Sequence, residues 1–160
     1  LTGGLVVSTD NLSEFWMGFW TLCGDVGDLS PIQNIWKGLE LYSVAEALGV
    51  PREPSQAVPT DGVDVTPGGP DQDQLGLAYP ELDRVIVRLL QEKFRGPRDL
   101  APGAADALFE RIAAETGLPP AAVAHVARRL AETHFKRHWP REITREETGL
   151  PPLEAMRVVE

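Results

Sequence analysis

The stretch from residue 5 to residue 14, LVVSTDNLSE, decides the fold of this chain. Leu5 to Ser8 is an apolar, β-branched run without alternation, which is typical of a strand buried inside a parallel sheet. Asn11 followed three residues later by Glu14 has the spacing of a capping box, so a helix is predicted to begin here. Thr9 then lies just past the carboxyl end of a strand, where ligands bind in open α/β sheets.

The predicted helix that follows is unusually aromatic. Phe15, Trp16, Phe19 and Trp20 cover most of its surface, so it must be buried against the sheet or against a partner. A further helix is predicted from Lys37 to Leu48, where apolar residues recur at helical spacing and Gly49 follows as a stop.

The chain is expected to be mostly helical after residue 80. Apolar residues at helical spacing predict three helices, over residues 80–94, 104–116 and 119–133. Before them, residues 51–72 are rich in Pro, Gly and Asp and carry neither a helical nor a strand pattern. A loop of that length is typically either functional or disordered, and we predict a substrate loop.

The composition excludes some classes of protein and favours others. The 160 residues carry a net charge of −9, which argues against general binding of nucleic acid. No apolar run approaches a membrane span. A lone cysteine, Cys23, excludes a disulfide within the chain and favours a reducing compartment, hence a cytoplasmic location. Six basic residues nevertheless gather between Arg128 and Arg145, and such a cluster suits an anionic ligand such as a phosphate.

Several short motifs, in order, resemble the signature of NAD synthetases. They comprise Val7 to Glu14, Gly18 to Asp25, Pro31-Ile32, Lys37, Pro59-Thr60, Asp71, Leu75-Gly76, Tyr79, Leu82-Asp83, Phe135-Lys136-Arg137 and Pro140. Together they span roughly residues 3 to 141.

The resemblance implies a fold and a reaction. The fold would be α/β, part of a Rossmann-like parallel-sheet ATP-pyrophosphatase domain that forms homodimers. The reaction would be the ATP-dependent amidation of nicotinic acid adenine dinucleotide (deamido-NAD) to NAD through an adenylylated intermediate. ATP would act with Mg²⁺, and the nitrogen would come from ammonia or from a glutaminase domain.

The resemblance also implies which residues contact ATP and its metal. Thr9, Lys37 and Thr60 would contact ATP, and Glu14 would help to hold Mg²⁺, which needs only one or two protein carboxylates when it sits on phosphates. Each position has a plainer alternative: a threonine at a helix entry, a surface lysine, a Pro-Thr turn and the capping box itself.

Three further residues would contact the dinucleotide. Asp28 matches after a one-residue deletion is allowed, although an aspartate in a loop is often a turn former. His134 and Lys136 fall where the family has a His-Lys-Arg or Phe-Lys-Arg motif. No residue of the chain is assigned as catalytic.

The sequence also departs from the family pattern. The family's phosphate loop, Ser-Gly-Gly-x-Asp-Ser, is absent from residues 1–160, so the whole chain is interpreted as the C-terminal portion of a synthetase domain, with residues 134–160 as a basic tail. Leu22 and Phe135 resemble glutamine-dependent members. We expect the fragment alone to be inactive; the alternatives are a truncated, non-catalytic homologue that acts as a nucleotide-binding or assembly module, and another ATP pyrophosphatase.

Overall fold

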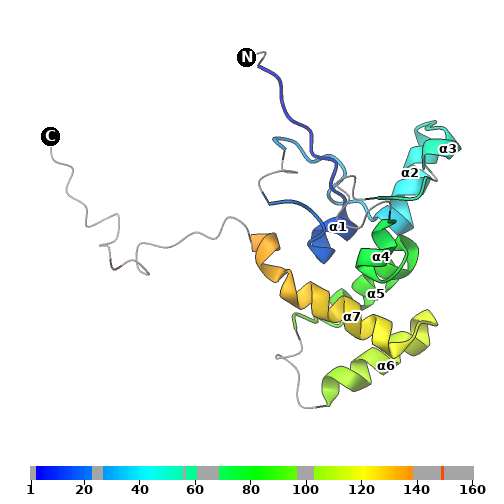
Figure 1. Ribbon diagram of the computed structural model, residues 1–160, viewed down its shortest axis with the longest axis vertical. Coiled ribbons are helices and arrows are strands. Elements are labelled where there is room, and N and C mark those ends of the chain that lie inside the picture. Colours follow the sequence, from blue (N-terminus) through cyan, green and yellow to red (C-terminus); the bar gives the residue numbers. More distant parts are fainter. Residues whose placement is uncertain are drawn as a thin grey trace.

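The computed structural model describes residues 3–22, 27–55, 57–60, 69–96, 103–138 and 149 (Figure 1). Its helices are α1 (Leu12–Met17), the π-helix η1 (Lys37–Leu41), α2 (Tyr42–Ala47), α3 (Arg52–Ser55), α4 (Asp71–Leu75), α5 (Tyr79–Gln91), α6 (Ala104–Thr116), α7 (Pro120–Glu132) and the 3₁₀-helix η3 (His134–His138). Helices α2 and α3 project away from the packed group formed by α5, α6 and α7 (Figure 1).

The core lies between α5, α6 and α7, as the helical periodicity predicts. Their apolar faces are buried, and Met17 of α1 and Leu75 of α4 complete the same cluster. The fully buried apolar side chains of the three long helices are Leu82, Val85, Ile86, Leu89, Ile112, Val123, Val126 and Ala127. All three predicted helices of this segment are therefore confirmed, with ends within a few residues of those expected.

The N-terminal strand differs from the prediction. In the described residues, strand pairing is confined to one isolated parallel bridge between Val7 and Leu29, and Leu5, Val6 and Val7 are 74 %, 61 % and 54 % exposed. A parallel strand becomes buried only when neighbouring strands and covering helices flank it on both faces. The apolar run is therefore strand-like in its pairing with Leu29 but not buried, and the expected sheet is not seen.

The segment from Lys37 to Leu48 is helical but not a single α-helix. It begins as η1, where the Leu41 N–H donates to the Trp36 carbonyl at 2.9 Å across five residues, and continues as α2. A Cβ on Gly38 would lie 2.3 Å from the Tyr79 carbonyl carbon, so the backbones of η1 and α5 are in direct contact. The π-helical turn of η1, which is wider than an α-helical turn, thus lies where the backbone of Gly38 meets that of Tyr79.

The Pro- and Gly-rich segment contains more helix than its composition predicts. Helix α3 lies within it and α4 begins at its end, with the Asp71 N–H donating to the Pro59 carbonyl at 2.8 Å. Residues 56 and 61–68 of the predicted substrate loop, and residues 139–148 and 150–160 of the predicted basic tail, lie outside the described residues.

Among the described residues, none of the helices combines the length and the apolar character that a crossing of the bilayer requires.

Candidate functional site

Four side chains from four helices meet at the first turn of α1, and we call them the acid–lysine cluster: Glu14, Lys37, Asp71 and Tyr79. Lys37 Nζ lies 2.9 Å from Glu14 Oε1 and 3.7 Å from Asp71 Oδ2. The Tyr79 hydroxyl donates to Asp71 Oδ2 at 2.8 Å and lies 3.3 Å from Glu14 Oε1. Residues that are distant in the chain thus form one polar site.

Glu14 serves two purposes at once because its two oxygens face different ways. Oε2 accepts the Asn11 backbone N–H at 3.2 Å, and Asn11 Oδ1 accepts the Glu14 N–H at 3.1 Å, which completes the predicted capping box. Oε1 points to Lys37 and Tyr79. The cap therefore fixes the carboxylate in its place and leaves one oxygen for the site.

Tyr79 lies against Lys37 as well as between the two carboxylates. Lys37 Nζ lies 4.1 Å from the centroid of the Tyr79 ring, a cation–π arrangement. Burial, with smaller contributions from Glu14 and Asp71, raises the pKa of the Tyr79 hydroxyl above its ordinary value. The hydroxyl stays protonated and remains a donor to Asp71.

The acid–lysine cluster suits a divalent cation that is shared with phosphates. Two carboxylates and one ammonium give it a formal charge of −1. Asp71 Oδ1 is buried, and no described residue forms a hydrogen bond with it. In the described part of the chain, no group of three or more His, Cys, Asp or Glu side chains is placed to hold a metal by itself. Mg²⁺ typically takes only one or two carboxylates and completes its shell with water and phosphate oxygens, so these residues fit it.

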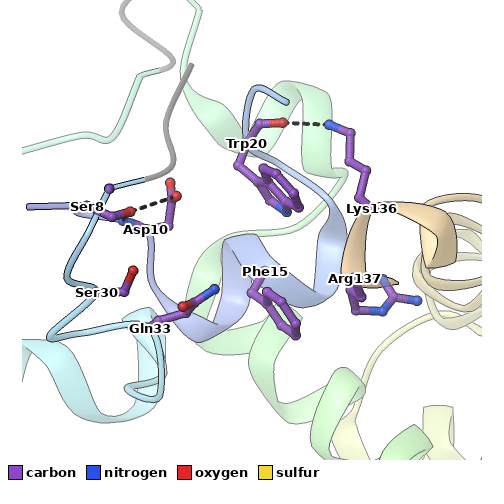
Figure 2. Close-up of a pocket in the computed structure, with 9 residues that line it drawn as sticks. Ser8, Asp10, Phe15, Trp20, Ser30, Gln33, Lys136 and Arg137 are labelled. Atoms are coloured by element: carbon purple, nitrogen blue, oxygen red, sulfur yellow. Dashed lines mark hydrogen bonds between the residues drawn. The ribbon is translucent and has the colours of Figure 1, made fainter. Parts of the chain in front are cut away.

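A second site, the N-terminal pocket, is lined by Phe15 of α1 and by residues of the segments around it (Figure 2). It has a volume of about 260 Å³. Ser8 Oγ donates to Asp10 Oδ2 at 3.0 Å on one side, and Lys136 contacts the Trp20 carbonyl on the other (Figure 2). The lining residues are Ser8, Asp10, Phe15, Trp20, Gly27, Ser30, Gln33, Lys136 and Arg137.

The basic residues near η3 hold the end of α1. Lys136 Nζ donates to the carbonyls of Gly18 and Trp20 at 2.8 and 2.6 Å. Arg137 donates to the Trp16 carbonyl at 2.7 Å, and Arg129 to the Met17 carbonyl at 3.1 Å. Cations at a helix C-terminus satisfy its free carbonyls and complement its dipole.

Each of these three cations also lies near an aromatic ring of the α1 segment. Arg137 lies 5.1 Å from the Trp16 ring centroid, and Lys136 lies 5.4 Å from that of Trp20. Burial lowers the pKa of Arg137 to about 10. Arg129, Lys136 and Arg137, which the sequence assigns to a site for an anionic ligand, are thus engaged in contacts within the chain. They pack against the aromatic side chains of α1 and of the residues that follow it.

The remaining predicted contact residues lie apart from one another. Asp28 is exposed, and its Oδ2 accepts the Val6 N–H at 2.9 Å, so its side chain supports the bridge between the two N-terminal segments. Thr9 and Thr60 are exposed; Thr9 follows Ser8 of the N-terminal pocket, and Thr60 follows Pro59, whose carbonyl contacts Asp71.

His134 is exposed and pairs with another histidine. Its Nε2 lies 3.1 Å from His138 Nε2, and partial burial, His138 and nearby arginines lower its pKa below 6.5. It does not line the N-terminal pocket, whereas Lys136 does.

Asp71 and Tyr79 are site residues that sequence reasoning did not assign. Both fall in the motifs that resemble the family, but Asp71 ends a loop and Tyr79 begins a helix, and nothing in either local pattern predicts a contact with Lys37. The signal lies only in the tertiary contacts that carry them to the first turn of α1.

Comparisons with known proteins identify the family of this chain. The family model described as NAD synthase matches residues 1–140. The NH(3)-dependent NAD(+) synthetase of Pyrococcus horikoshii is 32% identical over 139 residues, 86% of this chain and 48% of the relative, and that of Chlorobaculum parvum is 33% identical over 69% of this chain and 39% of the relative. The chain spans less than half the length of these curated relatives.

A solved structure shares the fold. The NMN synthetase from Francisella tularensis superposes with a TM-score of 0.56 at 22% identity and covers 88% of this chain and 46% of that chain. Because the family model matches residues 1–140, which is most of the sequence, this chain belongs to the NAD synthase family.

Proposed function

We propose that this chain provides the ATP-phosphate side of an enzyme that amidates deamido-NAD to NAD through an adenylylated intermediate. The observation that supports this best is the acid–lysine cluster, in which Lys37 Nζ lies between two carboxylates, 2.9 Å from Glu14 and 3.7 Å from Asp71. Two carboxylates can ligate Mg²⁺ and the ammonium can contact phosphate oxygens, so together they suit a magnesium–triphosphate complex.

The roles of the individual residues follow from their chemistry. Lys37 would contact phosphate oxygens, and Glu14 and Asp71 would hold Mg²⁺, which, when bound, neutralises charge that develops on the phosphates during adenylyl transfer. The Tyr79 hydroxyl keeps Asp71 oriented through a hydrogen bond of 2.8 Å. Thr9 and Thr60 would contact ATP elsewhere along its length.

The N-terminal pocket is proposed as part of the site for the dinucleotide. Its polar lining, with Ser8, Asp10 and Ser30 opposite Lys136, offers donors and acceptors to a ribose or a phosphate, and Asp28 and His134 would contribute from its surroundings. The names of the curated relatives make ammonia the nitrogen donor to test first, with glutamine second. A homodimer in the cytoplasm is part of the same proposal.

Binding of MgATP to the 160-residue chain tests the phosphate side directly. Isothermal titration with MgATP should give a measurable heat for the wild-type chain and for Arg128→Met, an exposed control. Lys37→Met should weaken the affinity at least about tenfold, the effect of losing one charge-assisted hydrogen bond. Equal affinities for Lys37→Met and wild type would contradict the assignment of Lys37.

Turnover is tested with the complete open reading frame that contains this sequence. Incubation with ATP, Mg²⁺, ammonia and deamido-NAD should release AMP and form NAD, and Lys37→Met should lose both products. A parallel reaction that monitors NMN tests the product suggested by the name of the Francisella protein. If neither product forms and no AMP appears, the proposed reaction is wrong.

A second candidate is a nucleotide-binding or assembly module without catalysis of its own. For the isolated chain we accordingly propose binding of MgATP without ligase turnover. AMP release by the purified 160-residue chain would contradict this second candidate.

A further inference from the structure

The backbone that carries Lys37 is held by side chains from two other helices. The Lys37 N–H donates to Ser13 Oγ of α1 at 2.9 Å, and the next N–H, that of Gly38, donates to Asp83 Oδ2 of α5 at 2.7 Å. Both acceptor side chains are fully buried. These two N–H groups open η1, and the first N–H groups of a helix have no partner within the helix.

The residue at the usual capping position does not take this role. Trp36 precedes η1 and makes no side-chain capping hydrogen bond. Ser13 and Asp83 therefore act as caps supplied from a distance in the sequence. Because they come from different helices, they fix η1 against α1 and α5 together.

Close packing around Gly38 further restricts the position of η1. A Cβ on Gly38 would lie 2.4 Å from the Pro80 nitrogen as well as 2.3 Å from the Tyr79 carbonyl carbon. The backbone of η1 is thus seated directly on the first turn of α5, three residues before Asp83. Little room remains for Lys37 to shift without loss of both hydrogen bonds.

Asp83 is unusual because it is a carboxylate with no cation in contact with it among the described residues. It is 0% exposed and its Oδ1 has no hydrogen-bond partner in that part of the chain. Buried acidic groups without a counter-charge are costly and rare in a purely structural setting. Asp83 accepts hydrogen bonds from Ser13 and from the backbone N–H groups of Gly38 and Leu39. Two of these three donors directly follow Lys37 in the chain, and the third, Ser13, itself accepts the Lys37 N–H, which points to the backbone around the lysine as the reason Asp83 is there.

We propose that Asp83, together with Ser13, is a positioning residue that fixes Lys37 for contact with phosphate. Asp83 does not reach the acid–lysine cluster itself; it acts through the Gly38 N–H. The role of Lys37 toward phosphate rests on the proposed function, whereas the placement of Lys37 by Asp83 is tested without any ligand.

The first experiment measures the exposure of the Lys37 amine. Lys37, Lys93 and Lys136 are the lysines of the sequence, and Lys93 is exposed, so its rate of acetylation by limiting acetic anhydride is an internal reference. Asp83→Ala should raise the rate of Lys37 relative to Lys93 several-fold, because Lys37 leaves its carboxylate partners. Asp83→Asn, whose amide oxygen still accepts the Gly38 N–H, and Asp106→Ala, an exposed aspartate of α6, should leave the ratio within about twofold of wild type.

The second experiment measures the affinity for MgATP of the same variants. Asp83→Ala should bind MgATP about tenfold more weakly, because a displaced Lys37 loses much of its contact with the phosphates. Asp83→Asn should bind MgATP with an affinity close to that of the wild type. Ser13→Ala should change the acetylation ratio and the affinity for MgATP in the same direction as Asp83→Ala. If Asp83→Ala does not fold, Ser13→Ala alone tests the positioning role.

The two proposals fail in different ways. An unchanged ratio of Lys37 to Lys93 acetylation in folded Asp83→Ala and in Ser13→Ala would overturn the positioning role, whatever the affinity for MgATP. An altered ratio in a chain whose wild type does not bind MgATP would uphold the positioning role and overturn the proposed function.

Discussion

Lys37 Nζ lies 2.9 Å from Glu14 Oε1, although the two residues are 23 positions apart in the chain. The contact depends on the capping box of α1, which fixes Glu14, and on the hydrogen bonds that hold the first turn of η1. The same ammonium lies 3.7 Å from Asp71 at the start of α4. One charged group therefore joins three segments, and its removal should affect both binding and stability.

Lys37→Met should destabilise the chain by about 1–3 kcal/mol, because two carboxylates that are largely buried lose their shared cation. The side chains of Glu14 and Asp71 are 13 % and 4 % exposed. Urea denaturation monitored by tryptophan fluorescence measures the loss. Mg²⁺ should stabilise the variant more than the wild type, and the opposite order would contradict the pairing of the two carboxylates.

Gly38→Ala should cost about 1–3 kcal/mol and should weaken MgATP binding, because the new Cβ meets the backbone of α5 rather than a mobile side chain. Gly96→Ala is the matched control, since its Cβ would meet the Ala131 methyl group at an ordinary 3.7 Å. Thermal unfolding followed by circular dichroism compares the two variants. Equal melting temperatures would show that η1 is free to move away from α5.

Arg137→Met should lower the free energy of unfolding by about 1.5–3 kcal/mol. It removes donors to the carbonyls of Trp16 and Leu130 and keeps most of the apolar stem. Arg128→Met changes the same charge at an exposed position and should remain within about 0.5 kcal/mol of wild type. A loss as large for Arg128→Met would mean that net charge, and not the end of α1, is responsible.

The stability contributed by Asp83 should depend on pH in a defined direction. Burial raises the pKa of Asp83 from 3.8, with a further increase from Glu40, against hydrogen bonds from Ser13, Gly38 and Leu39 that lower it. The folded state then binds the proton more tightly than the unfolded state. The contribution of Asp83 is therefore fully present below pH 3.8 and is lost as the pH rises through the raised pKa of the folded state.

Asp83→Asn removes this ionisation and keeps an acceptor for the Gly38 N–H. Relative to wild type, the variant should gain stability as the pH rises from about 4 to about 8, by about 1.4 kcal/mol for each unit by which the pKa is raised. Urea denaturation of both proteins at a series of pH values gives the difference. A difference that is constant with pH would show that Asp83 has an ordinary pKa.

The local patterns of the sequence were sufficient for most of the helices. Periodic apolar residues predicted α5, α6 and α7, and the spacing of Asn11 and Glu14 predicted the capping box, because each pattern reports an interaction within one helix or one helix face. The prediction of a buried strand at Leu5 to Ser8 was wrong for the described structure. Burial of a strand is a property of its neighbours, which its own sequence does not contain.

By itself the sequence determined the family and the helical segment after residue 80, since motif order and helical spacing are properties of the linear chain. It also singled out Lys37 and Glu14 as candidate site residues. Only the tertiary structure decided what these residues contact. It brought Asp71 and Tyr79 to Lys37, turned Lys136 and Arg137 toward the free carbonyls of α1, and placed the buried Asp83 beneath the Gly38 N–H. The physical reason is the same in each case: these contacts join segments that are far apart in sequence, so they form only after the helices have packed.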